Sequence, residues 1–152
     1  MEGLEGRSML AVVTWDGGAD GTGTDFLDAV NWYGDVLPAA VDTAVIGTTG
    51  ASAAITLAGI TNVAEIDSSR DIVLFGGSIV GSRFVGTDGA ALVMTSSGGT
   101  LDGVTAAGDL DLTGNANVTV VNGLTLDHST VRIGNRDGTT SGQMYLRGTQ
   151  LL

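Results

Sequence analysis

Four aspartates near the N-terminus are the residues of this 152-residue chain whose type and spacing best suit chemistry. Asp16, Asp20, Asp25 and Asp28 share one glycine-rich stretch, and carboxylate oxygens on a flexible loop are ligands that Ca²⁺ prefers. The spacing lacks the alternating acids, the central glycine and the distal glutamate of an EF-hand. Solvated turns, in which each aspartate bonds its own backbone, are therefore the alternative. Calcium is the candidate cofactor, with these four side chains as its ligands.

The other titratable groups do not predict catalysis. His128 is the only histidine and the chain has no cysteine, so we expect no transition-metal site. Asp127, His128 and Ser129 carry the groups of a hydrolytic triad, but neighbours on one strand point to opposite faces. Asp109 and Asp111 would share a face, as the acids of polysaccharide-cleaving β-helices do, yet no array of basic residues accompanies them. We expect a protein that is not an enzyme.

The overall charge narrows the range of partners. Asp and Glu together number 17, against six arginines and no lysine, which gives a formal net charge of −11. Binding to nucleic acid or to an anionic membrane surface needs a basic patch, which such a composition does not supply. No apolar stretch has the length of a transmembrane helix. We therefore expect neither nucleic acid as a partner nor insertion into a membrane.

Glycine recurs at an interval that indicates a structural repeat. The segment 77–81 (GSIVG) is echoed by the segment 99–103 (GTLDG), and weaker echoes begin at Gly59, Gly123 and Gly148. The intervals between the five leading glycines are 18, 22, 24 and 25 residues, which is the length of one turn of a β-solenoid.

Pairs of apolar residues two positions apart lie between these glycines, with the spacing of one face of a short strand. They are Ile55/Leu57, Leu92/Met94, Leu110/Leu112, Val118/Val120, Leu124/Leu126, Val131/Ile133 and Met144/Leu146. We expect them to face inward in an all-β fold, a parallel β-solenoid. A β-sandwich is the alternative, because it shows the same alternation. In a solenoid, the Asp-Gly dipeptides at 88–89, 102–103 and 137–138 would form corners instead of hairpins.

Three zones divide the chain. Residues 1–13 form a leader with an apolar run that could be donated as a strand to a neighbouring molecule. Residues 14–43 contain both tryptophans and the only proline, and residues 44–152 hold the solenoid turns. A solenoid must shield its first turn from water, so we interpret 14–43 as an N-terminal cap packed by Trp15, Phe26 and Trp32. Stacking of a sugar on Trp32 and Tyr33 is the alternative role for these rings.

Two stretches resemble exported bacterial proteins. Residues 4–11 (LEGRSMLA) resemble the LEPR-x-LL motif at the N-terminus of large exported planctomycete proteins, with Gly6 in place of the usual proline and Met9 in place of the first leucine. Residues 14–18 (TWDGG), 31–38 (NWYGDVLP) and 42–46 (DTAVI) resemble the segment at which the β-helix of autotransporter-like and filamentous surface proteins begins. The resemblance implies export, a right-handed β-helix, and a role in adhesion, matrix or appendages.

These observations predict an extracellular structural protein, a cell-surface filament subunit that assembles head to tail by stacking of β-edges. The candidate assembly residues are Leu10, Val12 and Val13 at one end and Leu151 and Leu152 at the other. The sequence stops in mid-pattern, so either it is the front part of a longer protein or another subunit covers the last turn. An adhesin stalk or a module that binds cell-surface glycans is the alternative function.

Overall fold

The computed structural model describes residues 10–48 and 53–150, and in this part of the chain short strands alternate with turns. One 3-10 helix is present among these residues, η1 (Ala29–Asn31). The strands are β1 (Val12–Thr14), β2 (Thr43–Ile46), β3 (Ile55–Leu57), β4 (Ile60–Thr61), β5 (Glu65–Ser68), β6 (Ile72–Leu74), β7 (Ser78–Val80), β8 (Arg83–Gly86), β9 (Ala91–Met94), β10 (Thr100–Ala107), β11 (Asp109–Leu112), β12 (Asn117–Leu126), β13 (Val131–Ile133) and β14 (Gln143–Arg147).

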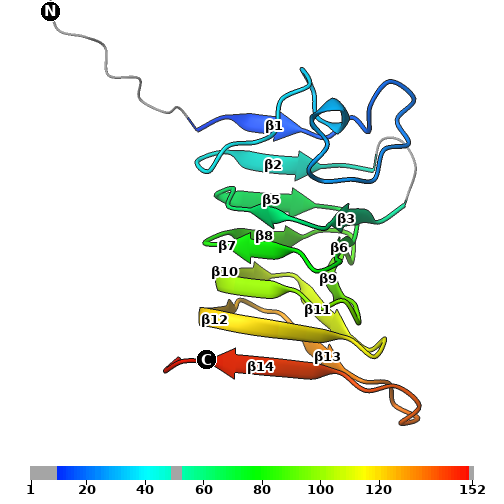
Figure 1. Ribbon diagram of the computed structural model, residues 1–152. Helices are drawn as coiled ribbons and strands as arrows, with labels where there is room; N and C mark the ends of the chain where they lie inside the picture. The colour runs from blue at the N-terminus through cyan, green and yellow to red at the C-terminus, as the bar shows by residue number, and fades with distance from the viewer. Residues whose placement is uncertain (1–9, 49–52, 151–152) are drawn as a thin grey trace, which may run out of the picture.

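The strands form two parallel sheets, and within each sheet they follow one another along a common axis (Figure 1). The larger sheet has the order β1-β2-β5-β8-β10-β12-β14, with β7 also paired to β10 and β4 to β7. The smaller sheet has the order β13-β11-β9-β6-β3. The fold is a β-solenoid of about four turns, as predicted from the sequence. The β-sandwich alternative is wrong, because sandwich strands pair antiparallel whereas all the strand pairs of the two sheets are parallel.

Inward-facing apolar side chains stack in columns, one residue per turn. Ile55 is in register with Ile72, which in turn is in register with Leu92 and then Leu110. All four are fully buried, while the residues between them on each strand are partly exposed. The alternation arises because successive side chains of a strand point to opposite faces. The predicted inward pairs on β3, β9 and β11 and the pair Val118/Val120 on β12 are confirmed.

The leading glycines of the predicted repeat occupy two columns, whereas the sequence predicted a single series. Gly59, Gly77 and Gly99 follow each other on successive turns, since Ser78 N–H donates to the Gly59 carbonyl and Thr100 N–H donates to that of Gly77. A Cβ at Gly77 would lie 2.2 Å from the Leu57 carbonyl oxygen, so no larger residue fits there.

A second column, Gly81 and Gly103, lies at the corner that follows, where the Gly81 N–H donates to the Asp102 carbonyl. Both glycines have left-handed backbones, with φ of 64° and 61°. Gly123 belongs to this corner, because Asp102 is in register with Val121 and Val104 with Leu124. The prediction that placed Gly123 in one series with Gly59, Gly77 and Gly99 was therefore wrong in phase, although the turn length was right.

Replacing Leu112 with aspartate tests the register. Leu112 is fully buried, so Leu112→Asp would place a charge in an apolar column and should lower the free energy of unfolding by more than about 3 kcal/mol. The neighbouring Asp111→Asn is the matched control. The Asp111 carboxylate lies outside the core and accepts hydrogen bonds from Thr113, which an asparagine oxygen also accepts. Urea unfolding of both variants measures the effect, and similar losses would contradict the assigned faces.

Candidate functional surfaces

The four aspartates of the predicted calcium loop each bond their own backbone. In every case Oδ1 accepts a hydrogen bond from the N–H two residues further along the chain: Gly18 to Asp16 (2.9 Å), Thr22 to Asp20 (3.0 Å), Leu27 to Asp25 (2.9 Å) and Val30 to Asp28 (3.3 Å). The Thr22 hydroxyl also donates to Asp20, and these two bonds lower the pKa of the Asp20 carboxyl from its ordinary value. This is the arrangement of turn aspartates.

Asn31 is the residue that holds this loop in place. Its carbonyl accepts the N–H groups of Asp16 and Gly17 at 2.9 and 3.0 Å, and its buried side chain donates to the Asp25 carbonyl at 2.9 Å. A Cβ at Gly23 would collide with the Asn31 side chain, so the loop needs glycine at that position. Sequence reasoning missed Asn31. An asparagine that follows a run of turn residues and precedes a buried tryptophan was the available signal.

The loop does not gather its carboxylates around a common point. Across residues 10–48 and 53–150, no group of three acidic or histidine side chains lies close enough together to hold a metal ion. The structure therefore supports the turn interpretation of Asp16, Asp20, Asp25 and Asp28 over the predicted calcium site. The physical reason is that each carboxylate faces the backbone of its own turn.

Chelation tests this conclusion. If the loop is held by turns and by Asn31, excess EGTA should leave the melting temperature unchanged, because no bound ion contributes to stability. Thermal unfolding followed by circular dichroism, with added CaCl₂ as the opposite condition, is the measurement. A rise in melting temperature with calcium that EGTA reverses would restore the calcium site.

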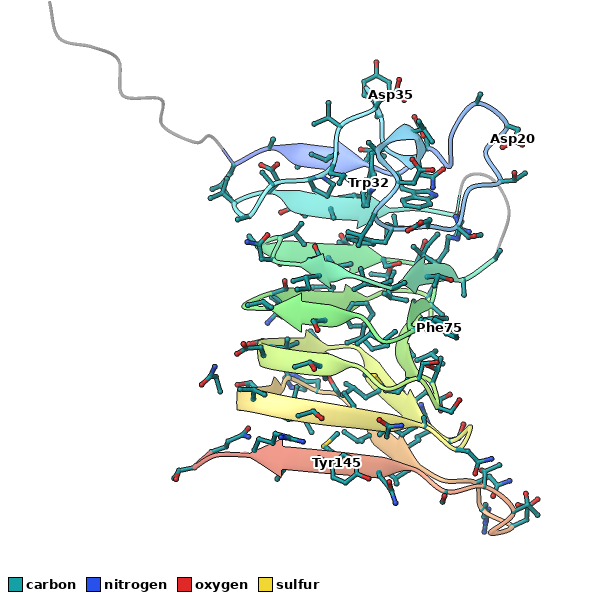
Figure 2. The ribbon with its side chains drawn as sticks, viewed as in Figure 1. Asp20, Trp32, Asp35, Phe75 and Tyr145 are labelled. Atoms are coloured by element: carbon teal, nitrogen blue, oxygen red, sulfur yellow. The ribbon has the colours of Figure 1, made fainter. Side chains whose placement is uncertain are left out.

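Three aromatic side chains pack together at the N-terminal end of the core. The ring centroids of Trp15 and Trp32 are 5.0 Å apart and those of Phe26 and Trp32 are 5.1 Å apart, both edge to face. All three side chains are buried, and Trp32 Nε1 donates to the Phe26 carbonyl at 2.8 Å. Figure 2 shows Trp32 within this end of the stack. A sugar cannot stack on a buried ring, so the alternative role for Trp32 is wrong, whereas Tyr33 is 78% exposed.

The segment that carries these rings pairs with the first solenoid turn in both sheets. β1 runs parallel to β2, and the Phe26 N–H donates to the Thr56 carbonyl of β3 at 2.9 Å. The three rings are buried in the same core cluster as the first strands of each sheet. That they act as a cap of the solenoid remains a prediction.

The two tryptophans should respond differently to phenylalanine. Both changes remove similar ring volume, but Trp32→Phe also leaves the Phe26 carbonyl without its donor. Trp15 Nε1, in contrast, is buried and has no hydrogen-bond partner among the described residues, so Trp15→Phe removes an unpaired group. We expect Trp32→Phe to cost about 1–3 kcal/mol more in chemical denaturation. Equal losses would contradict this account of the cluster.

The acidic residues considered for catalysis are engaged in contacts between turns. Asp127 pairs with Arg83 at 2.8 Å and with the exposed His128 at 2.7 Å, and these partners, Arg83 first, lower the pKa of the Asp127 carboxyl. The Ser129 hydroxyl donates to the Ala106 carbonyl of the preceding turn, so it is not paired with His128.

Asp109 is occupied in a similar way. It accepts the Thr130 N–H at 2.9 Å and pairs with Arg132 at 2.7 Å, and these contacts, in that order, lower the pKa of its carboxyl. Asp111 Oδ1 accepts hydrogen bonds from the N–H and the hydroxyl of Thr113, the residue that follows β11. The structure thus brings together neither a hydrolytic triad nor a free carboxylate pair from these residues.

A hollow on the described surface lies at a corner of the last turns and is lined by Gly103, Val104, Asn122, Gly123, Thr125, Thr149 and Gln150. Its lining has no titratable side chain. The Gln150 amide occupies backbone groups there, accepting the Gly123 N–H at 3.1 Å and donating to the Val120 carbonyl at 2.7 Å. The only side-chain hydroxyls in its lining are those of Thr125 and Thr149, and the lining contains no base that could activate them.

The predicted assembly residues fall into three groups. Leu10 and Val12 are 79% and 70% exposed, whereas Val13 is half-buried and packs on the core. Val12 and Val13 belong to β1, which is already paired with β2 of its own chain, and the Thr14 carbonyl on the other edge of β1 accepts the Tyr33 N–H at 2.8 Å. The strand is therefore part of its own sheet and not a free segment for donation. Leu151 and Leu152 lie outside the described residues.

The last turn exposes the columns that are buried in the turn before it. Leu126 is in register with Ala106, Ile133 with Leu112 and Leu146 with Val120. Exposure rises from 0% for each residue of the earlier turn to 46%, 53% and 46% for its partner in the last turn. The sequence pattern predicted all three residues to face inward. They extend the inward columns, but nothing among the described residues covers them.

No protein-family model, curated protein or solved structure matches the chain at a significant level. Among the described residues, no helix is long and apolar enough to cross a membrane.

Proposed function

We propose that this chain is an extracellular structural protein whose turns associate, head to tail, with those of other copies to form a filament or surface appendage. The observation that carries the proposal is the open last turn. Leu126, Ile133 and Leu146 continue three buried columns and are about half exposed. A further β-layer with the same spacing would bury them.

The backbone at this end supports the same conclusion. β13 is the terminal strand of the smaller sheet, and β14 is the terminal strand of the larger one. A terminal strand has a row of N–H and C=O groups that another strand can pair with, and proteins commonly protect such edges with lysine or proline. β13 and β14 contain neither residue. The geometry is therefore suited to continued parallel pairing.

The chemistry of the surface supports a role without catalysis. The carboxylates of Asp109, Asp111 and Asp127 serve contacts within the solenoid, and the hollow at the corner of the last turns has no titratable side chain in its lining. The acidic charge and the resemblance of the opening segment to exported bacterial proteins support a place outside the cell. These arguments favour a scaffold over an enzyme.

A single exposed residue of the last turn tests the filament. Ile133→Lys places a charge where the next layer would pack, and burial of one such side chain is worth about 1.5–3 kcal/mol. We expect the protein concentration needed for assembly to rise at least about tenfold, because 1.4 kcal/mol corresponds to a factor of ten. Sedimentation velocity over a concentration series, with electron microscopy of the same samples, is the measurement.

Phe75→Lys is the matched control for this experiment. Phe75 is 55% exposed, close to the 53% of Ile133, but it lies on the side of the stack (Figure 2). Both variants add one positive charge, so the control corrects for the change in net charge. Equal behaviour of the two variants, or a wild-type protein that stays monomeric at millimolar concentration, would contradict the filament. The second result would favour an adhesin stalk or a glycan-binding module in which Tyr33 is the exposed ring.

A further inference from the structure

The two ends of the stack carry opposite charge. Residues 10–42, at the N-terminal end, contain six aspartates and no lysine, arginine or histidine. The last turn, residues 124–150, contains three of the five arginines of the described chain and two aspartates. Figure 2 shows Asp20 and Asp35 at one end of the stack and Tyr145, on the terminal strand β14, at the other.

Several of these charges have no partner of opposite sign within the described residues. Arg132 pairs with Asp109, but Arg136 and Arg147 make no ion pair in this part of the chain. At the other end, Asp20 and Asp35 are exposed. Asp20 uses Oδ1 for its turn, which leaves Oδ2 free for a cation. Asp42 is different, because it is buried and accepts backbone N–H groups with both oxygens.

We propose, building on the assembly described above, that the acidic N-terminal end of one copy docks on the open last turn of the next copy. Arg136, in the loop between β13 and β14, would face the aspartate-rich segment that contains Asp20, and the apolar columns of the last turn would lie beside this contact. In Figure 1 the loop between β1 and η1 and the loop between β13 and β14 project to the same side of the stack. A copy placed below without a large rotation therefore brings the acidic loop toward the loop of Arg136.

Charge also determines the direction of stacking. Two N-terminal ends facing each other would bring two sets of six aspartates together, and like charges at an interface suppress the wrong pairing. Head-to-tail contact between unlike ends is heterologous, and it propagates into a polar filament unless it closes into a ring. The net charge of −11 makes copies repel each other in every arrangement that does not use this attraction. Added salt screens both effects, so charge variants are the sharper probe.

Neutralising aspartates either at the N-terminal end or on the side of the stack distinguishes attraction between the ends of two copies from the general repulsion between acidic molecules. Asp20→Asn with Asp35→Asn removes two charges at the N-terminal end, and Asp67→Asn with Asp88→Asn removes two from the side of the stack. Asparagine keeps the acceptor that Thr22 uses, and it tolerates the left-handed backbones of Asp35 and Asp88, with φ of 56° and 54°. The two double variants have the same net charge.

The end variant should raise the concentration at which half of the protein is assembled by about tenfold, and the side variant should lower it or leave it unchanged. Arg136→Gln should act like the end variant. Sedimentation of the full chain measures assembly, and unchanged melting temperatures confirm that each variant is folded. If filaments form equally well in both end variants, the docking proposal is wrong although the proposed function stands. If the unmodified chain forms no assemblies at any concentration, both are wrong.

Discussion

The structure depends on the stacking of each inward side chain on its counterpart one turn away. The column Ile55, Ile72, Leu92 and Leu110 is buried because every member has a neighbour on the next turn in parallel register. In such a fold the stability of a turn belongs largely to its interfaces with adjacent turns. Isoleucine is therefore fully buried in the middle of the stack, as at Ile72, and half exposed in the last turn, at Ile133. In the proposed association, the N-terminal end of another copy would cover these half-exposed members of the columns.

The corners between strands contain residues that keep successive turns in register. Serine and threonine hydroxyls there donate to carbonyls of the preceding turn, as Ser82 does to Val63 and Thr95 does to Leu74. These bonds satisfy backbone groups at places where the strands have ended, which matters because unpaired polar groups are costly once buried. Glycine is required where two backbones approach, as at Gly77. The polar and glycine residues of the sequence thus serve the same register as the apolar ones.

Much of this was predictable because the period of the pattern reflects the geometry directly. Alternating pairs such as Leu110/Leu112 predict an inward face, and the recurrence of glycine predicts the length of a turn. The phase of Gly123 was not predictable, since it depends on the register shift between β10 and β12. The exposure of Ile133 was missed because periodicity indicates which way a side chain faces and not whether another layer covers it. The role of Asn31 depends on contacts that fold back from a loop, which spacing alone does not encode.

The direction of the hydrogen bonds has a mechanical consequence. The strands lie across the stack, so the bonds between turns point along its axis, and β1 and β14 lie at opposite ends (Figure 1). A pulling force applied through these two ends would act along the hydrogen bonds between turns. It would open them one turn at a time instead of loading many of them together in shear. Ion pairs that cross turns, such as Asp109 with Arg132, tie neighbouring turns together against this peeling. The solenoid would be compliant and would yield stepwise under tension. Compression along the same axis would be borne by the packed columns of the core.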